Sequence, residues 1–524
     1  MASAKLPLVS CAFDGGNIVQ KGVLPLDGGA VQLRLAIKPD VYTNGTDKTA
    51  HAQWFYFKVS RCKGVPLRVA IEDIEAVCSY PDGFKGYTTA CSYDRRRWFR
   101  ARNATYVTGA AHAAAPHLTR HDSFTEVDDD AATVAGDASF LPLARYNSDA
   151  RTFAKPPLPP VPEVAVTADV DGSRGVLQWS LTPEFDTVYF AYWTPYSLER
   201  HADVVAELAT SPLCEAWSLG QSLDGRDLDV LTFGTGPLQL WVAARQHPGE
   251  TMAEWAAEGC ARKLADADDP KARALRAAAT VHVVPNMCPD GSFRGHLRTN
   301  ASGANLNREW ASGVYGDYEA PTLARSPEVY HMLKHLDATG CDGYIDIHGD
   351  EEIEANFTAG AEGCPCYDAA MSAHYEGFCH HFCKATPDFQ HAPGVEGRGY
   401  EPTPPGEANL SVCTNAIATR YGCLAVTLEQ PFKDSTFHTP EPVCGWSGPR
   451  ALKLGAALVD ALLDTVPAIA ARKKKGAGPL QPGVAPLVRV RLDLLGRLAG
   501  PARRVPVVVL AVPALGQERR VDGR

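Results

Sequence analysis

The 524-residue sequence has no apolar run long enough to span a membrane. A spanning helix needs about 20 apolar residues, and the late apolar stretch 505–515 is short and interrupted by Pro506 and Pro513. The first sixteen residues also lack the sustained apolar core of a signal peptide. We therefore expect a protein that is neither membrane-inserted nor secreted.

The sequence also lacks the regular cysteine spacing of a secreted disulfide scaffold, because its 15 cysteines are odd in number and irregularly placed. We expect mostly reduced thiols and a cytoplasmic protein. Two short groups, Cys364-Pro-Cys366 and the segment 379–383 (CHHFC), offer ligands for a zinc knuckle. Neither has a second ligand pair at zinc-finger spacing, so we interpret both as structural.

Positive charge is scarce, since 51 Lys and Arg face 61 Asp and Glu, for a net charge of −10. Sequence-independent binding to nucleic acid or anionic lipid needs a positive surface, so we expect neither. Residues 472–524 are the exception, with 12 basic and 3 acidic residues, or +9. Residues 1–471 therefore carry 39 − 58 = −19. We interpret the tail as a solvated, poorly ordered segment; a nuclear address or a weak anionic contact is the alternative.

The length predicts two to four domains at about 150 residues each, and the 45% apolar content is that of a globular protein. Residues 1–195 carry many short segments rich in β-branched and aromatic residues, separated by Gly, Pro and Asp. This pattern predicts an all-β sandwich domain. We expect it to be interrupted by an exposed loop at 109–137 and a stiff connector at 155–163.

From about residue 198 strands alternate with helices, which predicts an α/β domain over 196–470, followed by the basic tail 471–524. Its sheet should be mixed, largely parallel and flanked by helices. The expected strands are 228–234, 238–246, 281–285, 344–348 and 423–429, and the expected helices are 251–264, 269–278, 327–337 and 449–463. Active sites of such sheets lie at the carboxyl ends of the strands.

Three of these strands end in residues that can bind a metal ion or transfer a proton. His247 and Glu250 follow one strand, His348 follows another, and Glu429 ends a third. Two histidines and a glutamate with an open fourth position are a known way to hold a catalytic zinc ion. Each residue alone is more often an ordinary polar residue at a strand end, but together they predict one zinc ion per chain.

A polar loop, residues 286–310, lies between these elements and shows little helical or strand periodicity. Long polar loops inside a compact domain are usually functional. Guanidinium groups near a metal suit bidentate binding of a carboxylate, whereas a solvated basic loop is the alternative. The candidate residues are Arg294, His296, Arg298, Asn307 and Arg308.

Four segments in this order, RQHPGETMAEW, PNMCPDGSFRGHLRTNASGANLNREW, DIHGDE and TLEQPF, resemble the M14 zinc carboxypeptidases. The resemblance is greatest to their cytosolic carboxypeptidase branch and its bacterial-type relatives, and it covers roughly residues 200–465. FAYWTPYSLER is similar to the end of that branch's N-terminal β-sandwich. We recognise no counterpart of the basic tail.

The resemblance implies a role for each matching residue. It implies that His247, Glu250 and His348 are the zinc ligands and that Glu429 is the general base and then the general acid. It implies that Arg298 polarises the scissile carbonyl. It further implies that Asn307 and Arg308 hold the substrate's terminal carboxylate. For the mobile tyrosine of the family, Tyr400 and Tyr421 both remain candidates.

The same resemblance implies a peptide or protein C-terminal tail as the partner, and acidic tails such as those of tubulin as one substrate class. Arg294, His296 and Arg245 could supply positive charge for a terminal Glu or Asp. Two alternatives stay open: a zinc amidohydrolase that deacylates a small N-acyl amino acid, and a zinc-less binding module. The oligomeric state and the purpose of the tail stay open as well.

Overall fold

The computed structural model describes residues 6–42, 51–101, 103–109, 174–310, 319–389, 399–434 and 445–474. The expected loop beyond Gly109, the connector 155–163 and the tail beyond Lys474 lie outside these ranges.

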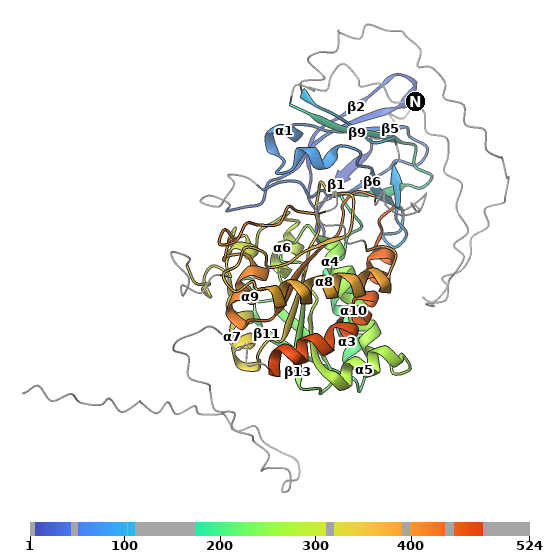
Figure 1. Ribbon diagram of the computed structural model, residues 1–524. Coiled ribbons are helices and arrows are strands. Elements are labelled where there is room, and N and C mark those ends of the chain that lie inside the picture. Colours follow the sequence, from blue (N-terminus) through green and yellow to red (C-terminus); the bar gives the residue numbers. More distant parts are fainter. Residues whose placement is uncertain are drawn as a thin grey trace, which may run out of the picture. The chain divides into compact units, whose positions relative to one another are not determined.

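The strands up to Ala191 form two five-stranded sheets (Figure 1). One sheet has the order β1-β4-β10-β6-β7 and is antiparallel throughout, and the other has the order β2-β3-β5-β9-β8 with one parallel pair, β3 and β5. The strands are β1 (Leu8–Ser10), β2 (Val19–Pro25), β3 (Val31–Ala36), β4 (Tyr56–Ser60), β5 (Leu67–Ile71), β6 (Thr89–Ser92), β7 (Phe99–Ala101), β8 (Thr105–Val107), β9 (Val176–Leu181) and β10 (Thr187–Ala191).

Large aromatic side chains fill the space between these two sheets. Trp179 of β9 lies 5.4 Å from Phe190 of β10 and 6.5 Å from Phe57 of β4, measured between ring centroids. All six residues of β9 are buried. Aromatic residues bury large apolar areas in such a core. The aromatic-rich segments of the sequence therefore form a β-rich N-terminal domain, as predicted.

The second domain is built on a seven-stranded mixed sheet with the order β11-β12-β14-β13-β15-β17-β16. The four central strands, β14, β13, β15 and β17, are parallel to one another, whereas β11, β12 and β16 pair antiparallel. The strands are β11 (Cys214–Gln221), β12 (Asp227–Phe233), β13 (Leu238–Ala244), β14 (Ala279–Val284), β15 (Gly343–Ile347), β16 (Phe357–Ala359) and β17 (Leu424–Glu429).

Helices cover both faces of this sheet, as the alternation along β13 illustrates. Leu240 and Val242 join the core cluster that contains α4 and α10, whereas Trp241 and Ala243 join the cluster that contains α7 and α9. The helices are α1 (Ile74–Val77), α3 (Leu198–Ala209), α4 (Thr251–Ala265), α5 (Pro270–Ala278), α6 (Pro289–Arg294), α7 (Pro327–Thr339), α8 (Ala369–Ala385), α9 (Cys413–Tyr421) and α10 (Gly448–Lys474), with 3₁₀ turns at Asp27–Gly29, Pro81–Phe84 and Leu306–Arg308.

Helix α10 extends beyond its predicted end and packs tightly on α4. A Cβ atom at Gly259 or at Gly455 would collide with the backbone of the opposite helix, so the two helices cross in close contact. Among the described residues α10 is the one helix that is long and apolar enough to cross a membrane. Half of its most apolar stretch is buried inside the protein. Arg472 donates to the carbonyl of Gly422 and Lys473 to Asp342, so the start of the basic segment belongs to the second domain.

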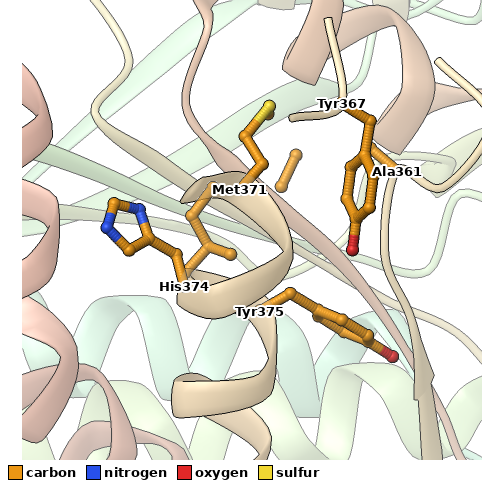
Figure 2. A pocket seen from close by; sticks show the side chains of 7 residues that line it. Ala361, Tyr367, Met371, His374 and Tyr375 are labelled. Carbon is orange, nitrogen blue, oxygen red and sulfur yellow. The ribbon is translucent and has the colours of Figure 1, made fainter. Parts of the chain in front are cut away.

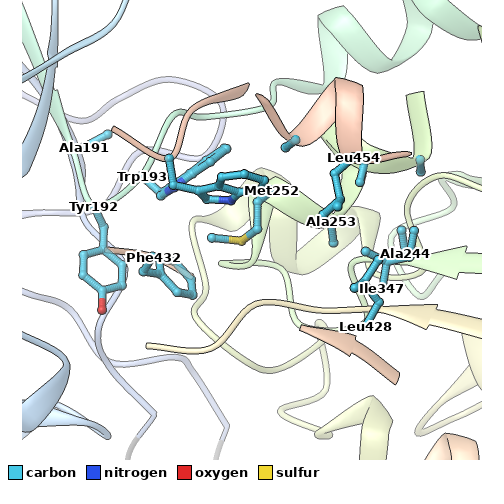
Figure 3. Close-up of a cluster of buried hydrophobic side chains, with 14 of the residues drawn as sticks. Ala191, Tyr192, Trp193, Ala244, Met252, Ala253, Ile347, Leu428, Phe432 and Leu454 are labelled. Carbon is cyan, nitrogen blue, oxygen red and sulfur yellow. The ribbon is translucent and has the colours of Figure 1, made fainter. Parts of the chain in front are cut away.

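The register of the central strands brings their carboxyl ends to one level. Ala244 pairs with Ile347, and Ile347 pairs with Leu428, so β13, β15 and β17 end side by side. The side chains of Ala244, Ile347 and Leu428 lie close together in a buried apolar cluster that also includes Met252 (Figure 3). The polar residues that follow the three strands are therefore held above a closely packed core.

Candidate metal centre and active site

His247, Glu250 and His348 meet at the carboxyl edge of the sheet. His247 follows β13 at the corner that leads into α4, and His348 directly follows β15. One ligand atom from each of the three side chains lies within 4.8 Å of the others, and all three residues are buried. This is the one such group of potential metal ligands that we find in the described part of the chain.

The contacts within this cluster leave both imidazole Nδ1 atoms directed at the same point. Glu250 lies between the rings, with its Oε1 at 2.6 Å from His247 Nδ1 and its Oε2 at 2.8 Å from His348 Nδ1. The two Nδ1 atoms themselves are 3.2 Å apart. The backbone N–H of Gly349 also donates to Glu250 Oε2, at 3.0 Å, and fixes the carboxylate.

Two acceptors fix the tautomers of these histidines. His247 Nε2 lies 3.1 Å from Asn305 Oδ1, and His348 Nε2 lies 2.9 Å from Asp346 Oδ2. Because Asn305 Oδ1 and Asp346 Oδ2 are acceptors, they favour a proton on each Nε2 atom, which leaves the two Nδ1 atoms to bind a metal ion. Outer partners that orient histidine ligands in this way are typical of metal sites. The donor set therefore fits a divalent cation such as zinc.

Charge in the cluster also favours a cation. Burial lowers the pKa of His247 to about 4, together with the charge of Arg298. Burial opposes protonation of His348 as well, yet Asp346 and Glu250 raise its pKa well above the usual value. The carboxylates of Asp346 and Glu250 thus favour positive charge at His348, whereas burial and Arg298 oppose it at His247.

Glu429 ends β17 beside this cluster and is 7% exposed. Burial raises its pKa well above the usual value, and the nearby carboxylates of Glu250 and Asp350 raise it further. Its Oε2 has no hydrogen-bond partner among the described residues. A buried carboxylate with a raised pKa and an open oxygen is suited to accept and return a proton.

The structure separates the two candidates for the mobile tyrosine. The hydroxyl of Tyr400 donates to Asp350 at 2.8 Å and lies 3.3 Å from Glu429 Oε1. The hydroxyl of Tyr421 instead donates to Asp337 at 2.7 Å, beside Arg420. Of the two, Tyr400 is the one that contacts the candidate general base.

The loop 286–310 brings its predicted residues toward the cluster to different degrees. Asn307 Nδ2 lies 3.5 Å from His348 Nε2, and its Oδ1 accepts the N–H of Cys413 at 2.8 Å. Arg308 is half-buried and donates to the carbonyl of Asn307 at 2.7 Å. Arg298 is close enough for its charge to lower the pKa of His247. Asn307 is thus beside the cluster and Arg298 is near it, whereas the roles of these residues and of Arg308 in substrate binding stay predictions.

Three other residues proposed for substrate binding make their contacts elsewhere. The guanidinium of Arg294 forms two hydrogen bonds to Asp224, at 2.8 and 3.2 Å. Arg245 is buried and pairs with Glu254 at 2.6 Å. His296 Nδ1 contacts the carbonyl of Thr299 at 2.9 Å. A role for Arg294 in substrate binding stays a prediction that no observed contact supports.

The cysteine groups do not converge with the histidines between them. Cys379 is buried on α8 with its Sγ 3.2 Å from Thr358 Oγ1, whereas His380 is exposed. Cys364 contacts the backbone of helix α9, and Cys366 contacts Thr419 on the same helix. The pocket in Figure 2 also lies away from the metal candidates, since residues 361–375 and 424–425 supply its lining.

Two residues at the site were not singled out from the sequence. Asn305 and Asp346 orient the histidines, although one is in the polar loop and the other is inside a strand. Asp346 precedes His348 by two residues and therefore lies on the same side of the strand. That spacing was a usable sign, whereas nothing in the sequence distinguishes Asn305 from the other asparagines of its loop.

Both domains match known families. Residues 9–125 match the cytosolic carboxypeptidase N-terminal domain, and residues 203–369 match the zinc carboxypeptidase domain. An uncharacterised protein of Zymomonas mobilis is 37% identical over 462 residues, covering 88% of this chain and 97% of that protein. Cytosolic carboxypeptidase 2 of Xenopus tropicalis is 27% identical over 64% of this chain, which spans 30% of that longer protein.

Solved structures agree with these matches. A metallo-carboxypeptidase from Burkholderia cenocepacia is 32% identical with a TM-score of 0.66, covering 88% of this chain and 99% of that one. A metallo-carboxypeptidase from Pseudomonas aeruginosa, solved with (2-guanidinoethylmercapto)succinic acid, is 32% identical with a TM-score of 0.67. It covers 88% of this chain and 100% of that one.

Proposed function

Because the chain belongs to the M14 zinc carboxypeptidase family and carries the N-terminal domain of the cytosolic branch, we propose that it removes single residues from the free C-termini of peptides or protein tails. The observation that carries this proposal is the buried cluster of His247, Glu250 and His348 beside Glu429. The three residues would hold one zinc ion. A bound zinc ion would lower the pKa of its water toward roughly 7 and polarise the scissile carbonyl.

The residues of the chain have separate tasks in this reaction. Glu429, with its unpaired Oε2, takes the proton from the attacking water and returns it to the leaving amine. Arg298 stabilises the charge that develops on the carbonyl oxygen, a contribution typically worth about 3–4 kcal/mol. Tyr400 contacts Glu429 and is placed to order that carboxylate.

Asn307 and Arg308 bind the terminal carboxylate of the substrate. An internal peptide bond would leave this guanidinium without its carboxylate partner, which disfavours endopeptidase activity. The succinic acid in the ligand of the Pseudomonas aeruginosa relative supports a site that takes carboxylates.

The test is a release assay on one peptide in two forms, a free acid and a C-terminal amide. We expect loss of one residue at a time from the free acid and no cleavage of the amide. Dialysis against a chelator should abolish the release, and added zinc should restore it. Cleavage of both peptide forms would contradict the proposal.

The preferred terminal residue is a further part of the proposal. We propose Glu or Asp, as in removal of glutamate from tubulin-like tails, with Arg294 as the candidate for the supporting positive charge. A basic terminal residue is the alternative, because the ligand of the Pseudomonas aeruginosa relative carries a guanidino group. Peptides ending in Glu, Leu and Lys distinguish the two, and equal rates on all three would contradict an acidic preference.

Other activities predict different outcomes in the same assays. A zinc amidohydrolase would release the acyl group from small N-acyl amino acids faster than it would shorten peptides. A binding module would retain no zinc and would release nothing. The names of the cytosolic relatives and the many cysteines support a cytoplasmic location.

A further inference from the structure

The loop that carries Arg298 is held by a carboxylate from the N-terminal domain. Asp40, which follows β3 and is 4% exposed, accepts the backbone N–H groups of Leu297 at 2.7 Å, Arg298 at 2.8 Å and Thr299 at 2.9 Å. The hydroxyl of Thr299 donates to the same carboxylate at 3.1 Å. Four donors from three consecutive residues thus converge on one buried side chain about 260 residues earlier in the sequence.

Such a carboxylate fixes the backbone more firmly than a neutral acceptor. Hydrogen bonds to an ionised group are roughly twice as strong as those between neutral groups. Here they leave the backbone from residue 297 to residue 299 little freedom to rotate. Since Arg298 lies at the centre of this segment, Asp40 fixes the backbone from which its side chain extends.

The N-terminal domain also contacts the side chain of Arg298. The guanidinium carbon lies 5.9 Å from the centre of the Tyr80 ring, within cation–π range. Tyr80 is held in turn by Gln53, which donates to its carbonyl at 2.7 Å and accepts its N–H at 3.1 Å. The backbone and the side chain of Arg298 therefore both rest on residues of the N-terminal domain.

A second contact connects this loop to the metal cluster. The carbonyl of Leu297 accepts the N–H of Gly249 at 2.8 Å, in the turn between His247 and Glu250. A Cβ at Gly249 would lie 2.9 Å from the same carbonyl oxygen, so the two segments are in close contact. A shift of the loop would thus change the position of Arg298 relative to the metal ligands.

We propose that Asp40 is a positioning residue for Arg298, so that the N-terminal domain completes the catalytic site. Its carboxylate holds the backbone of residues 297–299 in the conformation that directs the guanidinium at the reacting carbonyl. The proposal rests on the role proposed above for Arg298. It differs from a purely structural role because it predicts a loss of kcat that depends on Arg298.

The experiment compares Asp40→Asn with Glu72→Gln in the full-length, zinc-loaded protein. Glu72 is a buried carboxylate of the same domain, paired with Arg34 at 2.6 Å, and it provides a matched control. We expect Asp40→Asn to lower kcat by about 10- to 100-fold, the cost of misplacing a catalytic group by about 1 Å. KM and zinc content should change little, and Glu72→Gln should leave kcat unchanged.

The dependence on Arg298 is tested by combining variants. In the Arg298→Ala background, Asp40→Asn should lower kcat by less than about twofold, because residues that act through one another are not additive. An equal loss in both backgrounds would overturn the proposal, as would wild-type kcat in Asp40→Asn. Thr299→Val removes one of the four hydrogen bonds and should lower kcat less than Asp40→Asn does. It also provides a test if the Asp40→Asn protein fails to fold.

A readout without turnover separates this proposal from the proposed function. Amide hydrogen exchange in a peptide covering residues 293–300 should be faster in Asp40→Asn than in Glu72→Gln. Unchanged exchange would overturn the role of Asp40 even if the enzyme is active. If the wild-type protein cleaves no peptide, the proposed function fails, while faster exchange would still support the hold of Asp40 on the loop.

Discussion

The two ends of the central strands differ in what they bury. At the carboxyl ends of β13, β15 and β17 lie His247, His348 and Glu429. At the amino ends of β15 and β17 lie Cys341 and Cys423, whose sulfur atoms are 3.7 Å apart. The strand pairing is equally regular at both ends, so the backbone does not account for the difference.

The difference shows where the molecule accepts a free-energy cost. Buried carboxylates and an unpartnered oxygen at the carboxyl ends are unfavourable for folding. The thiols at the amino ends are small groups that pack like apolar side chains, and burial raises the pKa of Cys341 well above its usual value. Substitutions at one edge should therefore affect the reaction, and those at the other should affect only stability.

The largest effect is expected from the metal ligands. His348→Ala should remove zinc and lower kcat/KM by more than about 10²-fold, the upper range of the cost for an outer partner of a ligand. Zinc content by mass spectrometry and peptide release measure the two quantities. His380→Ala, an exposed histidine on α8, is the control and should retain both. Full activity in the zinc-free His348→Ala protein would contradict the assignment.

Glu429→Gln separates proton transfer from metal binding at the same edge. The amide has the size of the carboxylate but cannot accept the proton, so kcat should fall by at least about 10²-fold. The zinc content of Glu429→Gln should be unchanged, whereas His348→Ala should lose its zinc. Glu376→Gln, on the exposed side of α8, should be as active as the wild type. Wild-type turnover in Glu429→Gln would exclude this residue as the general base.

The cost of burying an acid should appear as a pH dependence of the free energy of unfolding, as at Glu328 of α7. Burial raises the pKa of Glu328 from 4.5 to about 8. The folded protein then keeps a proton that the unfolded chain releases, so the free energy of unfolding decreases as pH rises from 4.5 to about 8.

Glu328→Gln should remove this decrease. Between pH 5 and pH 8 its free energy of unfolding should rise by several kcal/mol relative to that of the wild type, since one pKa unit corresponds to about 1.4 kcal/mol. Urea unfolding of both proteins across that range measures the effect. Parallel pH profiles would show that Glu328 titrates normally in the folded protein.

The smallest effect on activity is expected at the amino ends. Cys341→Ala removes a buried sulfur and should destabilise the protein by about 1 kcal/mol, the centre of the range for single substitutions. Its kcat should stay within about twofold of the wild type, because the residue is at the opposite end of β15 from His348. A tenfold loss of kcat in a folded Cys341→Ala protein would contradict the division between the two edges.

The sequence predicted those parts of the fold that depend on local pattern. The strands that end before His247 and His348 are short, apolar and bounded by turn residues, and the structure has them close to the expected positions. Helix α8 was missed, although its buried residues Met371, Tyr375, Phe378 and Phe382 recur at helical spacing. The end of α10 was placed too early, since the helix continues beyond Pro467.

The site was predictable where strand order alone brings residues together. Contacts between distant segments were not: the ion pair of Arg294 with Asp224 joins residues 70 positions apart. Asp40 is 257 positions from the first residue that it holds. Such pairings depend on how the domains and loops pack, which no local pattern in a single sequence encodes.

The most direct test of the metal assignment is the anomalous X-ray scattering of zinc in crystals of the zinc-loaded protein. We predict one strong peak, bonded to the Nδ1 atoms of His247 and His348 at about 2.0–2.1 Å and to a carboxylate oxygen of Glu250. A peak at the cysteines of α8, or bonds through the Nε2 atoms, would contradict the account.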